Sequence, residues 1–234
     1  HVSRMMSLGV LTASIAHELN QPLSGIITNA NTCLRMLGAD PPDVDGARET
    51  ARRTIRDGNR ASEVIVRLRA LFTRKESTTE LVDLNEATRE VIALSSSNLQ
   101  RNRVVLRQEL ADDLPAVVGD RVQLQQVILN LLLNACDAMS DIDDRSRQLT
   151  ISTAGSDSGQ VRVVVRDAGV GVDPGTVDKL FEAFYTTKQS GMGIWLSVSR
   201  SIIEKHQGRI WAVQNDGPGA TFSFSIPRVP DNVL

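Results

Sequence analysis

Apolar residues recur every three or four positions along the first third of the chain, which is the spacing of one face of an α-helix. One such run extends from Leu8 to Leu37, and a second extends from Ala51 to Phe72. At about 100° per residue each run falls on a narrow stripe, so the pattern predicts two amphipathic helices. The stripe residues are Leu8, Leu11, Ile15, Leu19, Leu23, Ile26, Ala30, Leu34 and Leu37 in the first helix and Ala51, Ile55, Gly58, Ala61, Ile65, Leu68 and Phe72 in the second.

The two predicted helices are separated by "LGADPPDVDG", a stretch rich in helix breakers. Gly38, Pro41 and Pro42 end the first helix, and the aspartates of this stretch suit the cap of the second. A hairpin of two such helices leaves an apolar stripe uncovered, and two hairpins bury it by pairing as a four-helix bundle. The sequence therefore predicts a homodimer.

His17 falls almost opposite the apolar stripe of the first helix, within "ASIAHELNQPLSGI". We therefore expect His17 to be exposed; taken alone, it reads most simply as a solvated surface histidine. Pro22 has no N–H and leaves the carbonyl of Glu18 without its helical partner, so a bend is expected there. The same side of the helix carries Val10, Ser14, Gln21, Ser24, Thr28 and Arg35.

The pattern changes after the polar stretch "RKESTTELVD". From residue 83 onward helical and strand-like periods alternate, which indicates an α+β domain. The sequence predicts a helical domain over residues 1–75, a linker over 76–82 and a mixed domain over 83–234. In the mixed domain we expect helices at "DLNEATREVIALSSSNL" and "DRVQLQQVILNLLLNACDAM" and strands at "RVVLRQEL", "QLTISTA", "QVRVVVRD" and "FSFSIP".

The composition is that of an ordinary globular protein with a net charge of −2, from 26 basic and 28 acidic residues. This balance gives no support to a nucleic-acid-binding surface, and no apolar run is long enough to span a membrane. Cys33 and Cys136 lie in apolar helical contexts and are expected to be buried, reduced thiols. Because the sequence begins inside a helical pattern, we expect an upstream portion, where a sensor or a membrane anchor would lie.

Three short motifs in the second half suggest a site for a nucleotide. "NLLLNA" places Asn130 and Asn134 on one face of an apolar helix, where they would share a polar ligand such as a hydrated cation or cap a nearby loop. Asp167 leaves a strand into the glycine turn of Gly169 and Gly171, so its carboxylate would meet the amino group of a base or belong to an ordinary turn.

The third motif is "GMG", which opens a helix with Gly191 and Gly193. Free amides at a glycine-rich helix N-terminus bind phosphate, and Lys188 stands just before them as a cation. Each motif alone is a weak signal, but their fixed order along the chain is not.

In this order the chain closely resembles the bacterial sensor histidine kinases of two-component systems, over essentially its whole length, and among them the oxygen-sensing and nitrogen-regulatory type. "AHELNQPL" resembles the phosphoacceptor box of that family, and "NLLLNA", "DAGVG", "FEAFYTTK" and "GMG" resemble its successive ATP-site boxes. The implied fold is a dimeric helical bundle followed by a two-layer α/β sandwich of the gyrase and chaperone ATPase type. The implied activity is ATP-dependent autophosphorylation in the cytoplasm and phosphoryl transfer to a response regulator. The resemblance also allows a phosphatase activity toward that regulator.

The resemblance assigns roles to individual residues. It implies that His17 is the phosphoacceptor and that Glu18 helps to accept its proton. It implies that Asn130 and Asn134 serve the Mg²⁺–phosphate group, with Asn134 as the metal ligand, and that Asp167 reads adenine. It implies that Gly169 and Gly171 shape the adenine pocket. Residues 173–195 would form the lid over the nucleotide, which contains Lys188, Gly191 and Gly193. The response regulator would dock beside His17, near Gln21, Ser24 and Thr28.

The sequence departs from the family pattern at Trp195, which stands where the last glycine of the lid box belongs. A glycine there would let amides approach phosphate and could take a positive φ, so we expect Trp195 to weaken nucleotide binding. The alternative function is accordingly a catalytically weakened, dimeric signalling scaffold. A chaperone- or topoisomerase-type ATPase would have no use for the helix that carries His17.

Overall fold

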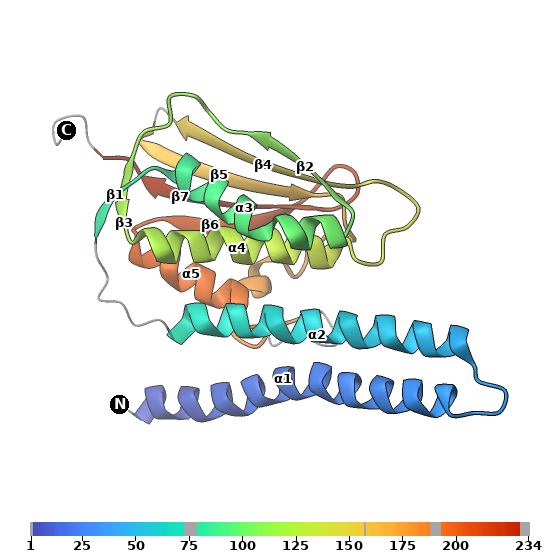
Figure 1. Ribbon diagram of the computed structural model, residues 1–234. Coiled ribbons are helices and arrows are strands. Elements are labelled where there is room, and N and C mark those ends of the chain that lie inside the picture. Colours follow the sequence, from blue (N-terminus) through green and yellow to red (C-terminus); the bar gives the residue numbers. More distant parts are fainter. Residues whose placement is uncertain (1, 73–78, 157, 188–192, 230–234) are drawn as a thin grey trace. The chain divides into compact units, whose positions relative to one another are not determined.

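The computed structural model describes residues 2–72, 79–156, 158–187 and 193–229 (Figure 1). The chain divides into two compact units, one comprising His1–Arg74 and the other Lys75–Thr186 with Gly193–Leu234. In the first unit side chains are described from Leu19 to Ala61.

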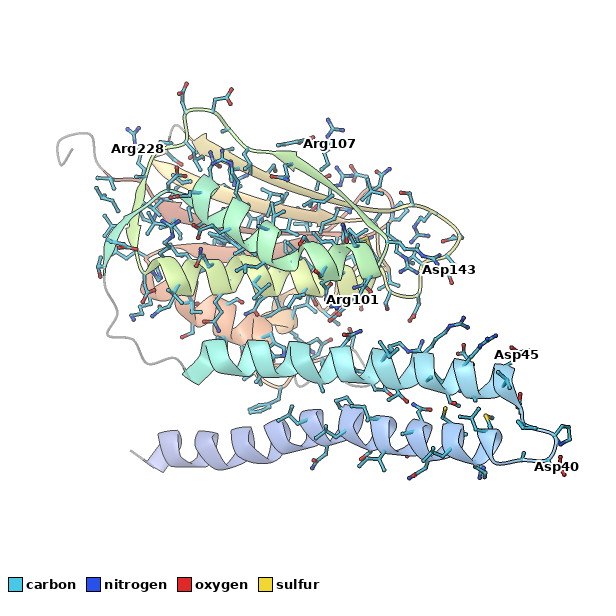
Figure 2. The ribbon with its side chains drawn as sticks, in the orientation of Figure 1. Asp40, Asp45, Arg101, Arg107, Asp143 and Arg228 are labelled. Carbon is cyan, nitrogen blue, oxygen red and sulfur yellow. The ribbon has the colours of Figure 1, made fainter. Side chains whose placement is uncertain are left out.

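The first unit is the predicted helical hairpin, formed by α1 (Val2–Leu37) and α2 (Val44–Phe72). The N–H of Gly38 donates to the carbonyl of Leu34, which ends α1 where the glycine was expected to end it. Asp43 caps α2 by accepting a hydrogen bond from the N–H of Gly46 at 2.9 Å. Figure 2 shows the exposed carboxylates of Asp40 and Asp45 in and beside this turn.

A polar contact joins the two helices near their middle. Asn29 Nδ2 on α1 donates to Asp57 Oδ2 on α2 at 3.0 Å. A Cβ at Gly25 would collide with the carboxylate of Asp57, so this glycine gives the carboxylate its place against α1. Pro22 lies inside α1 and is buried.

Much of the apolar surface of the hairpin is uncovered. Leu23, Leu34 and Ile55 of the predicted stripes are 46%, 69% and 65% exposed, although the stripes also supply the buried Ala61. The two helices therefore cannot bury their stripes against each other alone, which supports the predicted pairing with a second hairpin.

The second unit is built on a five-stranded sheet with strand order β2-β4-β5-β7-β6. β2 pairs with β4 in parallel, and the remaining neighbours are antiparallel. A separate two-stranded sheet is formed by β1 (Glu80–Val82) and β3 (Val117–Gly119). The strands of the large sheet are β2 (Val104–Glu109), β4 (Arg147–Ser156), β5 (Gln160–Asp167), β6 (Arg209–Gln214) and β7 (Ala220–Pro227).

Helices cover one face of this sheet (Figure 1). They are α3 (Leu84–Arg101), α4 (Arg121–Ala138) and α5 (Trp195–Lys205), and a short 3₁₀ helix, η1 (Val177–Phe181), precedes α5. Asp83 caps α3 by accepting from the N–H groups of Asn85 and Glu86. The predicted α/β sandwich is thus confirmed as one layer of helices on one sheet.

The core lies between the helices and the sheet. Val161, Val163 and Val165 of β5 point into it from alternate positions, while Leu131 and Leu132 of α4 cover them from the other layer. On the opposite face, Arg107 of β2 points away from the helices (Figure 2). Also on that face, the guanidinium groups of Arg162 and Arg209 lie 5.2 and 5.9 Å from the Trp211 ring.

The structure differs from the expected elements at three short strands. Residues 80–82, placed in the linker by the sequence, form β1, because Val82 is fully buried and pairs with Val117 of β3. β3 and β6 were also not expected from the sequence. β3 is a three-residue strand that pairs with β1, far back along the chain, whereas β6 is an edge strand that pairs with β7, the next strand in the sequence.

Candidate functional site

Asn130 and Asn134 lie one turn apart on α4. Asn130 is 5% exposed, and its Nδ2 donates to Ser199 Oγ of α5 at 3.2 Å. Ser199 Oγ in turn donates to the carbonyl of Trp195. Asn130 therefore bonds to a hydroxyl group on a helix and does not cap a nearby loop, the alternative that the sequence left open. Asn134 is half-buried.

Asp167 ends β5 as a buried carboxylate, 3% exposed. Its Oδ1 accepts hydrogen bonds from the N–H of Gly169 at 2.8 Å and from the N–H of Ala220 at 3.2 Å. Oδ2 takes no part in these two bonds. Backbone donors fix the carboxylate in one orientation and offset the cost of burying its charge.

The glycine turn after Asp167 packs on the C-terminal end of α4. The N–H of Val170 donates to the carbonyl of Ala138 at 3.1 Å, and a Cβ at Gly169 would collide with that carbonyl. Gly171 has φ of +79°, and the next N–H, that of Val172, donates to Gln214 Oε1. The fold thus brings the Asp167 turn to the helix that carries Asn130 and Asn134.

Other residues that the sequence analysis did not single out complete this turn. Arg145 donates to the carbonyls of Ala168 and Gly169 at 3.2 and 3.1 Å. Asn215 Nδ2 donates to the carbonyl of Asp167, and Gly219, with φ of +87°, gives the same carbonyl room. The glycine-rich stretch "NDGPGA" was the one feature of the sequence that pointed to Asn215 and Gly219.

The entry to α5 is held by Gly193. This glycine has φ of +65°, its carbonyl accepts from the N–H of Phe184 at 3.0 Å, and a Cβ would collide with the carbonyl of Tyr185. Two other residues expected at this entry, Lys188 and Gly191, lie outside the described residues.

The structure corrects one reason for expecting Trp195 to disturb the site. Trp195 is the first residue of α5, and among the described non-glycine residues only Arg103, Phe184 and Gln207 have a positive φ. The left-handed conformation belongs to Gly193, two residues earlier. Tryptophan at 195 therefore carries no backbone strain of that kind, and only its bulk remains as an argument.

His17 and Glu18 lie in the helical backbone of α1, but their side chains are outside the described ones. The exposure of His17 therefore stays a prediction. Among the expected docking residues, Gln21 is half-buried, whereas Ser24 and Thr28 are exposed.

Acidic metal clusters are absent from the part of the chain that the structure describes, where no three His, Cys, Asp or Glu side chains are placed to hold a metal ion. Asn130 and Asn134 nevertheless fit Mg²⁺, which is held by few protein oxygens when phosphate and water supply the rest of its shell. Among the described residues, no helix is both long and apolar enough to cross a membrane.

Two family models match the chain in succession. Residues 7–77 match the His Kinase A (phospho-acceptor) domain, and residues 119–230 match the histidine kinase-, DNA gyrase B- and HSP90-like ATPase.

Curated relatives match almost the whole chain. It is 39% identical over 227 residues to the sensor histidine kinase TmoS of Ectopseudomonas mendocina, covering 97% of the chain and 23% of the relative. It is 38% identical over 233 residues to the sensor protein FixL of Bradyrhizobium diazoefficiens, covering 99% and 46%. The chain thus spans less than half the length of these relatives.

Solved structures match as well. The catalytic domain of histidine kinase ThkA is 32% identical with a TM-score of 0.58, covering 64% of this chain and 96% of that one. ThkA in complex with the response regulator protein TrrA is 26% identical with a TM-score of 0.69, covering 98% and 64%.

Proposed function

Because the chain belongs to the sensor histidine kinases of two-component systems, we propose that it transfers the γ-phosphoryl group of ATP to His17 and then to an aspartate of a response regulator. The observation that carries the proposal is the packing of the Asp167 turn on the end of α4, through Val170 and Ala138. This packing joins the buried carboxylate of Asp167, which can bind a nucleobase, to the helix of Asn130 and Asn134, which can bind a metal–phosphate group.

Asp167 is the proposed reader of adenine. Two backbone N–H groups hold Oδ1, so Oδ2 is the oxygen that would accept a hydrogen bond from the adenine amino group. Guanine carries a carbonyl at the corresponding position, and its oxygen would face the carboxylate as a second acceptor. The same geometry therefore favours ATP over GTP.

Asn134 and Asn130 are proposed to serve the phosphate end of the nucleotide. Mg²⁺ supplies charge neutralisation on the phosphate oxygens when it is bound, and Asn134 would be its direct ligand. Asn130 is held by Ser199 through its Nδ2, so its Oδ1 is the atom oriented for a polar ligand. Lys188, Gly191 and Gly193 are proposed to complete the lid within residues 173–195, with Gly169 and Gly171 shaping the base pocket.

His17 is the proposed nucleophile. A neutral imidazole nitrogen attacks the γ-phosphorus, the bond to the bridging oxygen of ADP breaks, and the ring proton passes to Glu18. The aspartate of the regulator then attacks the phosphohistidine and regenerates His17. Phosphoryl transfer needs in-line positioning more than a strong base, which a donor domain on a separate unit can provide.

The proposed partners, a second copy of the chain and a response regulator, both bind the hairpin of α1 and α2. We propose a homodimer through residues 3–75, because the stripes of α1 and α2 are partly uncovered in one chain. The regulator would dock beside His17, near Gln21, Ser24 and Thr28. Since ATP and the regulator are cytoplasmic, this part of the protein would act in the cytoplasm.

The test is incubation with ATP labelled at the γ-phosphate, with and without Mg²⁺. We expect Mg²⁺-dependent label that is lost in acid and kept in base, as for a phosphoramidate. His17→Gln should abolish the label and leave ATP binding intact. Label that persists in this variant would show that another residue is the acceptor.

A further inference from the structure

His206, at the C-terminal end of α5, uses both of its ring nitrogens. Nε2 accepts a hydrogen bond from the backbone N–H of Asp120 at 3.0 Å, and Nδ1 lies 2.7 Å from the carbonyl oxygen of Ile202. A backbone N–H only donates and a carbonyl only accepts, so both bonds exist together only in the neutral ring with its proton on Nδ1.

The bond from Asp120 ties His206 to the start of α4. Asp120 is the N-cap of α4, where its carboxylate accepts from the N–H of Gln123. The preceding residue, Gly119, gives the ring its place, because a Cβ there would collide with His206. The imidazole thus fills the corner between the end of α5 and the start of α4.

A second link between the same helices lies further along α4 and earlier along α5. Asn130 of α4 donates to Ser199 of α5, ten residues beyond Asp120 and seven residues before His206. At 1.5 Å per residue the links are about 15 Å apart along α4 and about 10 Å apart along α5, with the helices running in opposite directions. Ile202 and Ile203 pack α5 into the core, and the two links add directional contacts that fix its direction and its position along α4 more closely than one link would.

We propose that His206 is a positioning residue of the nucleotide site, acting as the far anchor of α5 on α4. This inference rests on the proposed function, since it concerns the same pocket. α5 begins at Trp195, the last residue of the proposed lid (residues 173–195), and α4 carries Asn130 and Asn134. With the anchor released, α5 pivots about Ser199, and the lid end of α5 moves relative to the two asparagines.

The test compares two amides at position 206. His206→Gln places Oε1 near the position of Nε2 and keeps an acceptor for the N–H of Asp120. His206→Asn is one carbon shorter and leaves that N–H without its acceptor. We expect the KM for ATP to rise about tenfold in His206→Asn with kcat changed less than about threefold, and to stay within about twofold of the wild type in His206→Gln. Glu204→Gln, an exposed change on the same helix end, is the matched control and should be unchanged.

Thermal unfolding of each variant separates positioning from stability. A purely structural role would lower the unfolding midpoints of both variants, but at temperatures below those midpoints the two KM values would be the same. Equal KM values for the Asn and Gln variants would overturn the inference. The Kd for ATP is measured in parallel. A wild type that binds ATP but does not label His17 would count against the proposed function alone, and the Asn–Gln difference in Kd would still decide the role of His206.

Discussion

The carbonyl of Ala138, the last residue of α4, accepts a hydrogen bond from Val170 in the turn that follows Asp167, at 3.1 Å. This one contact joins α4, which carries the "NLLLNA" motif, to the "DAGVG" turn, about thirty residues further along the sequence. Gly169 makes it possible, because any side chain at 169 would push the turn off the helix end.

Gly169→Ala should therefore separate the base pocket from α4. We expect a loss of about 2 kcal/mol in the free energy of unfolding, typical of overpacking, and an ATP affinity about tenfold weaker. Denaturant titration and ATP titration measure the two effects. Gly217→Ala is the matched control, since a Cβ at 217 meets nothing within 4 Å and should change neither quantity.

Asp167→Asn keeps the shape of the side chain but removes its charge and replaces one oxygen by a donor. The affinity for ATP should fall by about 10- to 100-fold, as expected for a lost charge-assisted hydrogen bond, and the preference for ATP over GTP should shrink. Competition between the two nucleotides in one binding assay measures this preference. An unchanged ratio would place adenine recognition elsewhere.

Asn134→Ala should remove the dependence of ATP binding on Mg²⁺. In the wild type, chelation of Mg²⁺ is expected to weaken ATP binding, because the metal joins the phosphates to the amide oxygen. In the variant, affinities with Mg²⁺ and with chelator should be nearly equal. If Mg²⁺ strengthens binding to the same degree in both proteins, Asn134 is not the metal ligand.

Leu23→Glu combined with Ile55→Glu should weaken the dimer. Both positions belong to the apolar stripes and are largely exposed in one chain, so a charge there would be buried on pairing. Light scattering at micromolar concentration should show a shift from dimer to monomer. Leu94→Glu is the control, because Leu94 is 83% exposed on α3 of the other unit, and this variant should stay dimeric.

Replacing Trp195 tests whether its side chain weakens ATP binding. Because residue 195 is helical, the freedom of glycine is not needed there, and only the indole can obstruct the nucleotide. Trp195→Ala and Trp195→Gly should therefore both raise the affinity for ATP by several-fold and to a similar degree. A gain in the glycine variant alone would restore the argument from backbone freedom, and no gain in either would show that the tryptophan is tolerated.

The sequence by itself determined the elements with strong, regular patterns. The stripes of α1 and α2, the break at Gly38 and the long apolar run of α4 each reflect burial on one side of a local structure, which periodicity reports directly. Strand-like patterns likewise identified β5 and β7. The motifs also identified Asn130 and Asp167 as candidate site residues, because a polar side chain within an apolar helix or at the end of a buried strand requires a partner.

Only the tertiary structure decided what those partners are. Ser199 reaches Asn130 across 69 residues, Ala220 reaches Asp167 across 53, and His206 reaches Asp120 across 86. β1 and β3 became strands by pairing with each other across a long stretch of chain. Trp195 became a helical residue because Gly193 had already made the turn. Local patterns record which side of a segment is buried, but hydrogen bonds between distant segments exist only after the chain has closed around its core.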